Sequence, residues 1–165
     1  MKKLLITSIC IFIFLGLFAQ DSPSKPAYLR FPTLPPFTLI TSDSSTLTRN
    51  HLAKNHKTLF MYFSPGCDHC QVQTDSMLAN MNKLKDVQIL MVTYDSIHHM
   101  KAFYEERNLN VYKNIRMGYD SKYFFPPFYK MTNLPFMALY NKKGNFITSF
   151  EGNTPVGKIV EAFER

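Results

Sequence analysis

Hydrophobic and polar positions along the chain predict strands that alternate with helices. The near-continuous apolar runs at residues 58–63 and 87–93 are typical of strands buried on both faces of a sheet. Apolar positions recur at helical spacing in residues 68 to about 85 and in residues 96–107. Since a strand, a helix and a second strand in succession require parallel pairing with a right-handed crossover, this part of the chain predicts a parallel sheet.

The C-terminal part predicts an antiparallel hairpin and a last helix. Residues 136–140 and 146–150 have strand patterns, and the polar segment between them contains Gly144, which is typical of a hairpin turn. Pro155 is suited to the first turn of a helix that continues to about Glu164.

The remaining segments are less regular. A short strand is expected at residues 37–40, a polar turn at 41–46, and a short helix or irregular loop at 47–55, whereas the aromatic stretch 111–132 has no clear assignment. Together the elements predict an α/β fold with a mixed central sheet, helices on both faces, and a C-terminal β-hairpin plus helix.

The first 19 residues have the pattern of a secretory signal. Lys2 and Lys3 precede an apolar run over residues 4–18, and Ala19 ends a small-residue cleavage site. Because the apolar run of about 15 residues is short for a membrane span of roughly 20, cleavage after Ala19 is expected, with an uncleaved anchor as the alternative.

Three parts are therefore expected: a signal peptide at residues 1–19, a Pro/Ser-rich linker or arm at 20–36, and one domain at 37–165. Export would make the mature protein periplasmic or secreted, in a compartment where disulfides persist. No stable membrane insertion is expected after cleavage, whereas an uncleaved segment would anchor the protein to a membrane.

Charge and cysteine content narrow the functional classes. The chain has 19 Lys and Arg against 12 Asp and Glu, a formal net charge of +7, but these basic residues are scattered along the sequence without interleaved stacking aromatics. Nucleic-acid binding is therefore not expected, and the surplus charge predicts solubility rather than a docking surface. With Cys10 in the signal, the mature chain keeps two cysteines, so hydrophobic packing must hold the domain together.

These two cysteines form the motif Cys67-Asp68-His69-Cys70, between a predicted strand and a predicted helix. A cysteine at the start of a helix gains thiolate stability from the free backbone N–H groups and the helix dipole. Cys67 is therefore expected to be the exposed nucleophile, and Cys70, one turn further on, the buried resolving thiol. The pair can reduce a substrate disulfide through a mixed disulfide, or oxidise a substrate dithiol by the reverse path.

The two residues between the cysteines tune this redox balance. A protonated His69 would stabilise the Cys67 thiolate and make the disulfide more oxidising, whereas the negative charge of Asp68 would act in the opposite direction.

A second feature is Leu134-Pro135-Phe136, which places a proline at the start of a predicted strand. The chain resembles the thioredoxin superfamily, and within it the exported TlpA/ResA-like thiol-disulfide oxidoreductases. The residues that carry this resemblance are Phe63-Ser64-Pro65-Gly66-Cys67-Asp68-His69-Cys70, Leu134-Pro135-Phe136, Gly144 and Gly152. The resemblance extends from about Phe31 to the C-terminus. It implies a thioredoxin-like fold in which the peptide before Pro135 is cis and Pro135 packs against the cysteines. It also implies that Leu134, Pro135 and Gly66 form the substrate-binding surface.

Three positions depart from the family pattern. Gly66 replaces the usual Trp before the first cysteine, and Met61 stands about where thioredoxins bury an acid. Gln73 stands where many TlpA/ResA-like reductants have a Glu that shuttles the proton of the buried thiol, a task that an amide cannot perform. These departures leave the direction of electron flow open.

The sequence thus predicts an enzyme, a thiol-disulfide oxidoreductase that acts on exported proteins with Cys67, Cys70 and His69 as its catalytic residues. No cofactor and no metal are expected, since the cysteine pair carries the electrons. The expected partners are protein thiols and disulfides and an unidentified redox partner that resets the pair.

Alternatives from other classes stay open. Two thiolates would suit a Cu(I)-binding metallochaperone, and the aromatic stretch would suit a non-catalytic adaptor. A thiol peroxidase is disfavoured, because peroxiredoxins place Pro and Thr where this chain has Phe60 and Ser64. The pair His98-His99 is expected to be solvated rather than metal-binding, since adjacent helical residues do not share a face.

Overall fold

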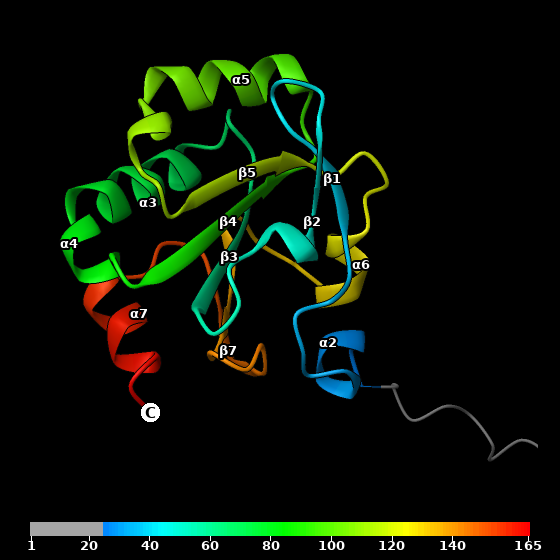
Figure 1. The fold of residues 1–165 in the computed structure, drawn as a ribbon, viewed down its shortest axis with the longest axis vertical. Helices are drawn as coiled ribbons and strands as arrows, with labels where there is room; N and C mark the ends of the chain where they lie inside the picture. The colour runs from blue at the N-terminus through cyan, green and yellow to red at the C-terminus, as the bar shows by residue number, and fades with distance from the viewer. Residues whose placement is uncertain (1–24) are drawn as a thin grey trace, which may run out of the picture.

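The computed structural model describes residues 25–165, which form one seven-stranded mixed sheet covered by helices (Figure 1). The predicted signal peptide at residues 1–19 lies outside the described residues. The strands follow the spatial order β2-β1-β5-β4-β3-β6-β7. Their bounds are β1 (Thr38–Ile40), β2 (Thr46–Thr48), β3 (Lys57–Phe63), β4 (Val87–Thr93), β5 (Ile115–Tyr119), β6 (Phe136–Tyr140) and β7 (Phe146–Glu151).

The centre of the sheet is parallel, as the strand–helix–strand pattern predicts. β3 pairs with β4 in parallel, from Lys57 opposite Val87 to Phe63 opposite Thr93, and β4 pairs with β5 in the same sense. β6 runs antiparallel to β3 and forms the predicted hairpin with β7, so the sheet is mixed. Gly144 in this hairpin has a φ of +78°, a left-handed conformation that glycine adopts readily.

Helices cover both faces of the sheet. In Figure 1, α3, α4 and α7 lie to the left of the sheet and α2 and α6 to its right. The bounds of the helices are α2 (Ala27–Arg30), α3 (Asp68–Ala79), α4 (Met81–Leu84), α5 (Ile97–Glu106), α6 (Phe125–Tyr129) and α7 (Val156–Ala162), with two short 3₁₀ turns, η1 (Arg49–His51) and η2 (Leu109–Val111). Among residues 25–165, no helix combines the length and the apolar character that crossing a membrane requires.

Each face of the sheet has its own core. Successive side chains of a strand point to opposite faces, so Met61 and Phe63 join a cluster under α3, α5 and α7, whereas Phe60 and Tyr62 join a second cluster. The first cluster is mainly aliphatic and methionine-rich. The second is aromatic, and the rings of Phe60 and Tyr129 lie 5.0 Å apart between centroids.

The structure differs from the predicted elements in three places. The helix expected over residues 68 to about 85 ends at Ala79 and resumes as α4, because Asn80 leaves the helical conformation and its side chain donates to the Ser76 carbonyl. β2 takes up the end of the polar turn expected at 41–46 and the start of segment 47–55, whose expected short helix or irregular loop contains η1. The unassigned aromatic stretch contains both β5 and α6.

Gly118 explains why β5 is hard to recognise from its sequence. A glycine interrupts the apolar pattern of the strand, yet the fold requires one, because an added Cβ would lie 2.7 Å from the Cβ of Leu39 on the neighbouring β1. Glycine within a strand is typical of such a close approach between two backbones.

Candidate functional site

The cysteine motif lies at the turn where β3 ends and α3 begins. β3 ends at the fully buried Phe63, and the Cys67 backbone N–H donates to the Ser64 carbonyl at 3.1 Å to close the turn. The Gln71 side chain donates to the Pro65 carbonyl at 2.8 Å and holds the turn against α3. Cys67 is therefore the N-cap of the helix, as predicted.

The two cysteines differ in exposure. Cys67 is half-buried, whereas Cys70 has no exposed surface and is part of the aliphatic core. Both are free thiols in the structure, and the Cys70 backbone N–H donates to the Cys67 Sγ at 3.4 Å. The Cys67 sulfur is therefore accessible from outside the domain, whereas Cys70 is buried behind it.

Burial changes the acidity of the second thiol. Desolvation raises the pKa of the Cys70 thiol to about 12, and its hydrogen bond to Cys67 acts in the same direction, whereas the Ser64 backbone opposes both. Cys70 therefore keeps its proton at neutral pH until a base approaches it.

The segment around Pro135 lies beside this turn. Tyr62 on β3 is opposite Phe136 on β6, so Pro135 lies next to the residues that follow β3. The Leu134–Pro135 peptide is cis, as the family resemblance implies. Leu134 is half-buried and packs against the same core cluster as Cys67. The fold thus brings together two segments that are about 70 residues apart in the sequence.

The other predicted site residues are exposed. Asp68 and His69 lie in the first turn of α3, and no hydrogen bond among residues 25–165 involves the His69 side chain. Gly66 is exposed, and a Cβ added to it would meet no atom within 4 Å. A side chain could therefore leave the backbone at this position without a clash at its Cβ.

Gln73 has a structural partner that the sequence does not reveal. Its side chain is 1% exposed, accepts from the Thr154 backbone N–H at 2.7 Å and donates to the Thr154 carbonyl at 3.1 Å. This pair of hydrogen bonds ties α3, one turn after Cys70, to the segment that leads into α7. Both functions of the amide are used, which an ionised carboxylate would not allow.

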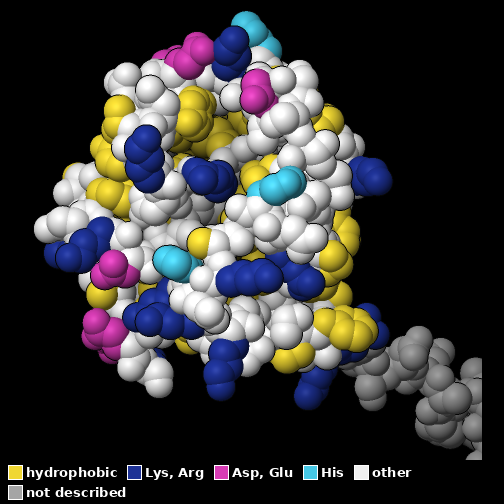
Figure 2. Space-filling model, in the orientation of Figure 1, with side chains coloured by type: hydrophobic (Ala, Val, Ile, Leu, Met, Phe, Trp, Pro, Cys, Tyr) yellow, Lys and Arg dark blue, Asp and Glu magenta, His cyan; other side chains and the backbone are white. Residues whose placement is uncertain are grey.

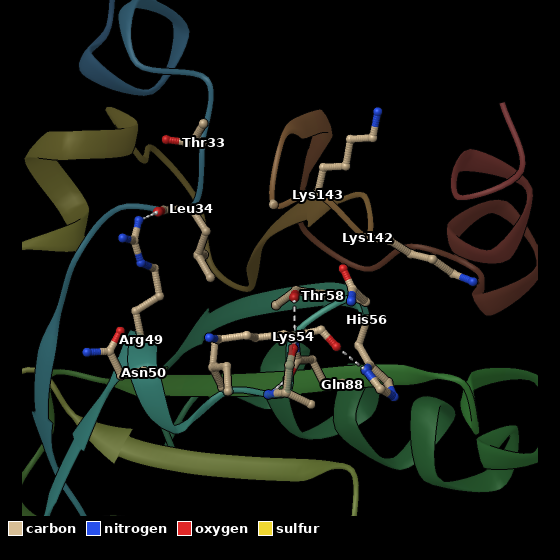
Figure 3. A pocket seen from close by; sticks show the side chains of 14 residues that line it. Thr33, Leu34, Arg49, Asn50, Lys54, His56, Thr58, Gln88, Lys142 and Lys143 are labelled. Carbon is tan, nitrogen blue, oxygen red and sulfur yellow. Dashed lines mark hydrogen bonds between the residues drawn. The ribbon is translucent and has the colours of Figure 1, made fainter.

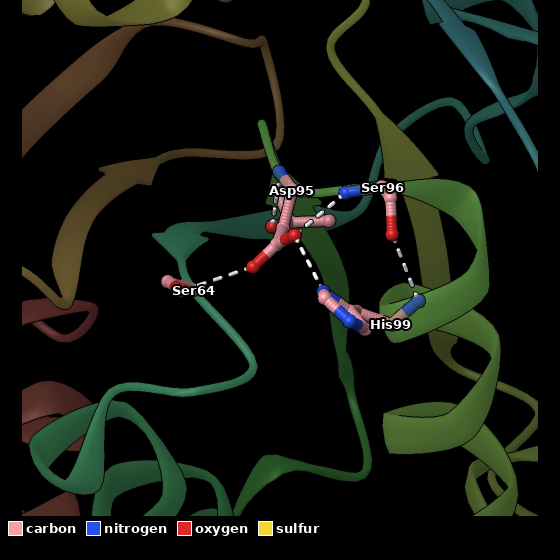
Figure 4. A network of polar contacts seen from close by, with 5 residues as sticks. Ser64, Asp95, Ser96 and His99 are labelled. Atoms are coloured by element: carbon pink, nitrogen blue, oxygen red, sulfur yellow. Dashed lines mark hydrogen bonds and ion pairs between the residues drawn. The ribbon is translucent and has the colours of Figure 1, made fainter.

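A polar network beside the turn was missed by sequence reasoning (Figure 4). Asp95 follows β4; its carboxylate accepts from His99 Nδ1 at 2.8 Å and from the Ser64 hydroxyl at 3.5 Å. Partial burial raises the pKa of Asp95, but the hydrogen bonds from His99 and Ser96 outweigh it, so the pKa is lowered overall. The signal available in the sequence is the i,i+4 spacing of Asp95 and His99 around the helix cap Ser96.

Metal-binding side chains are not gathered into a site in the part of the chain that the structure describes. No group of three or more His, Cys, Asp or Glu is placed there to hold an ion. The arrangement at the start of α3 allows thiol chemistry, because the accessible Cys67 and the buried Cys70 lie together there.

Solved structures share this fold. The thioredoxin domain of a thiol-disulfide oxidoreductase from Bacteroides vulgatus is 22% identical, with 81% of this chain and 96% of that chain covered and a TM-score of 0.64. A secreted disulfide oxidoreductase from Mycobacterium tuberculosis is 15% identical, with 78% and 94% covered and a TM-score of 0.64. A peroxiredoxin-like protein from Aquifex aeolicus is 17% identical, with 80% and 84% covered and a TM-score of 0.62. The fold is therefore thioredoxin-like.

Sequence comparison identifies the family. No curated protein sequence matches the chain. The model of the AhpC/TSA family matches residues 32–158, which include β1 to β7 and the cysteine motif. Since this match covers most of the chain, the protein belongs to the AhpC/TSA family.

Proposed function

We propose that this protein is an exported thiol-disulfide oxidoreductase of the TlpA/ResA-like type that exchanges disulfides with protein substrates. The observation that carries the proposal is the half-buried Cys67 at the start of α3, with the buried Cys70 thiol directly behind it. Leu134 and Pro135, in the segment beside the pair, are proposed to form a ledge on which a substrate backbone rests, completed by the open surface at Gly66.

The reduction of a substrate follows two exchanges. The Cys67 thiolate attacks one substrate sulfur, so a Cys67–substrate bond forms, the substrate disulfide breaks, and the other substrate sulfur leaves as a thiolate. Cys70 then attacks Cys67, forms the Cys67–Cys70 disulfide and releases the substrate sulfur that was bound to Cys67. The substrate gains two electrons, which the cysteine pair loses; Cys70 supplies one proton of the resulting dithiol, and solvent supplies the other.

Cys70 must lose its proton before the second exchange. Gln73, the buried polar side chain one turn away, cannot accept a proton. The substrate thiolate that leaves in the first step is therefore proposed as the base. The reverse sequence oxidises a substrate dithiol, and the redox partner that resets the pair determines the direction.

Export is supported by two observations. Residues 1–19 have the pattern of a secretory signal, and one structural neighbour is described as a secreted disulfide oxidoreductase. A periplasmic or secreted location follows if the segment is cleaved, and a membrane-anchored one if it is retained.

The test is an insulin-reduction assay together with equilibration in glutathione buffers, with the purified full chain. Cys67→Ser should abolish turnover, and Cys70→Ser should accumulate a mixed disulfide with the substrate that a thiol reductant releases. Cys10→Ser is the matched control and should keep full activity. Turnover that survives in Cys67→Ser would overturn the assignment, and tight Cu(I) binding without turnover would favour a metallochaperone. A parallel assay with hydrogen peroxide tests the peroxidase alternative, for which Phe60 and Ser64 are the wrong residues.

His69 is proposed to tune the pair. Its exposed imidazole in the first turn of α3 stabilises the neighbouring thiolate when protonated, so His69→Ala should make the reduction potential more negative by about 10–20 mV near pH 6. High salt should shrink the difference, because it screens the charge of an exposed side chain. An equal potential for His69→Ala and the unmodified chain at low salt would remove this role.

A further inference from the structure

The positive charge of the domain is concentrated at the end of the sheet where β3 and β4 begin. Three adjoining cavities at this end are lined by nine Lys and Arg side chains and only two acidic ones, a net formal charge of +7. The other described residues carry eight Lys or Arg and nine Asp or Glu. Basic residues that are scattered along the sequence are thus collected by the fold, and we refer to these nine side chains as the cationic end.

The first cavity has a volume of about 510 Å³ and no acidic residue in its lining (Figure 3). Lys142 and Lys143 project from the β6–β7 hairpin, and Lys54 from the loop before β3. Arg49 is held by a hydrogen bond of 2.9 Å from its guanidinium to the Leu34 carbonyl. That bond uses one of five N–H donors, so the guanidinium can still bind an anion.

The second and third cavities extend the same surface. Lys57, Lys83 and Lys85 line the second, and Lys113 and Arg116 contribute to the third. His56 lines all three cavities, so they form one continuous surface. Figure 2 shows Lys and Arg side chains spread across the middle and lower part of this face. None of the nine takes part in an ion pair among residues 25–165.

The N-terminal segment enters the domain at this end. Leu34 donates to the Gly144 carbonyl and Phe146 donates to the Pro32 carbonyl, so the segment runs along the hairpin that carries two of the lysines. Just before it, Leu29 is 45% exposed and Phe31 is 61% exposed. The guanidinium of Arg30 lies 5.5 Å from the centre of the Phe31 ring. Apolar side chains next to cations are typical of segments that lie in a membrane interface.

We propose that the cationic end binds the phosphate-bearing headgroups of an anionic membrane, with Leu29 and Phe31 in the interface. The apolar residues 4–18 precede this end in the sequence and would hold it at the same membrane if they are retained. β3 separates the cationic end from the cysteine motif by about 20 Å, so Cys67 faces the aqueous side. Free phosphate offers the same chemistry, but it would leave Leu29 and Phe31 without a partner.

The test uses the full chain with vesicles of phosphatidylcholine alone and with vesicles that also contain phosphatidylglycerol. Binding through residues 4–18 contributes to both, so the ratio of the two affinities reports on the headgroup charge. This ratio should fall at least about tenfold in Lys142→Glu/Lys143→Glu, because each cation near an anionic surface contributes separately. The matched control is Lys101→Glu/Lys122→Glu, which changes the net charge equally outside the cationic end and should keep the ratio.

Footprinting with an amine-reactive reagent locates the contact. Phosphatidylglycerol should slow the modification of Lys54, Lys85 and Lys142 severalfold, high salt should reverse the effect, and Lys101 should react equally with both vesicles. Equal ratios for the two double variants, or no protection, would overturn the proposal. Protection of the same lysines by inorganic phosphate without vesicles, at the strength seen with vesicles, would also overturn it and indicate a small-anion site.

Discussion

At the scale of single residues, burial has its clearest effect on Cys70. Enclosure in the aliphatic core raises the pKa of this thiol, and the raised pKa makes the stability of the fold depend on pH. The folded protein binds the Cys70 proton more tightly than the unfolded chain does, so a rise in pH above the ordinary thiol value of 9.0 favours unfolding.

The reduced protein should therefore lose stability between about pH 9 and pH 12, by up to about 1.4 kcal/mol per pH unit from this group. Urea unfolding of reduced samples at several pH values measures the loss. Buried tyrosines whose pKa is raised, such as Tyr62 and Tyr140, contribute to the same trend. The prediction is therefore the difference from Cys70→Ala, which should show a shallower pH dependence. Parallel curves for the two proteins would contradict it.

Gln73 gives a second prediction. In Gln73→Glu, an ionised carboxylate could not donate to the Thr154 carbonyl and would be buried without a cation, so the side chain should keep a proton when folded. A carboxyl group whose pKa is raised by folding binds its proton more tightly in the folded protein. The stability of the variant should therefore fall as the pH rises above the pKa of the unfolded chain.

The variant should accordingly be close to the unmodified protein near pH 4 and less stable by about 1–3 kcal/mol near pH 8, as measured by urea unfolding. Val72→Glu, which places a carboxylate at a 56% exposed position of the same helix, is the control and should show a much smaller pH dependence. An equal loss at both pH values would mean that the proton is not involved.

At the scale of elements, the pairing of β5 with β1 depends on Gly118. In Gly118→Ala the added methyl group would lie 2.7 Å from the Leu39 Cβ, so one of the two strands must shift. Thermal or urea unfolding should show a loss of about 1–3 kcal/mol.

The control for this change is Gly157→Ala. Gly157 lies in α7, and a Cβ there meets no atom within 4 Å, so the substitution should be neutral or should stabilise the helix by up to about 1 kcal/mol. A similar loss in both variants would point to a general effect of glycine replacement rather than to the contact with Leu39.

Sequence patterns predict well those elements whose residue pattern depends only on neighbouring positions in the chain. β3 and β4 are continuous apolar runs, and the hairpin has a glycine in its turn, so each can be recognised without its neighbours. β5 cannot, because Gly118 is required by a strand that is distant in the sequence. α6 is equally hidden, since Pro126 and Pro127 open a short helix whose aromatic side chains serve the second core.

The candidate site also has parts that the sequence predicts and parts that it does not. The cysteine motif is contiguous and can be read directly, and the family resemblance supplies Pro135. The link between Gln73 and Thr154 joins residues that are 81 positions apart, and no local pattern predicts it. The network of Asp95 and His99 is local, but its contact with Ser64 exists only because β3 and β4 end side by side.

At the scale of the whole molecule, chemistry and charge lie at opposite ends of the sheet. The cysteine motif follows the end of β3, whereas the cavities of the cationic end surround its beginning. Lys142→Glu/Lys143→Glu should therefore leave the rate of insulin reduction within about twofold of the unmodified chain, because screened charges at about 20 Å interact weakly. A stopped-flow measurement in physiological salt tests this, and a large change in rate would show that the two ends are coupled.

The length of β3 also sets the distance between the cysteine motif and the cationic end. If the cationic end lies on a bilayer, seven strand residues hold the reactive sulfur about 20 Å above the headgroups. Disulfides close to the membrane surface would then be out of reach, while those in domains that stand clear of it would meet the sulfur directly. A single buried strand would act as a spacer that selects substrates by their distance from the lipid.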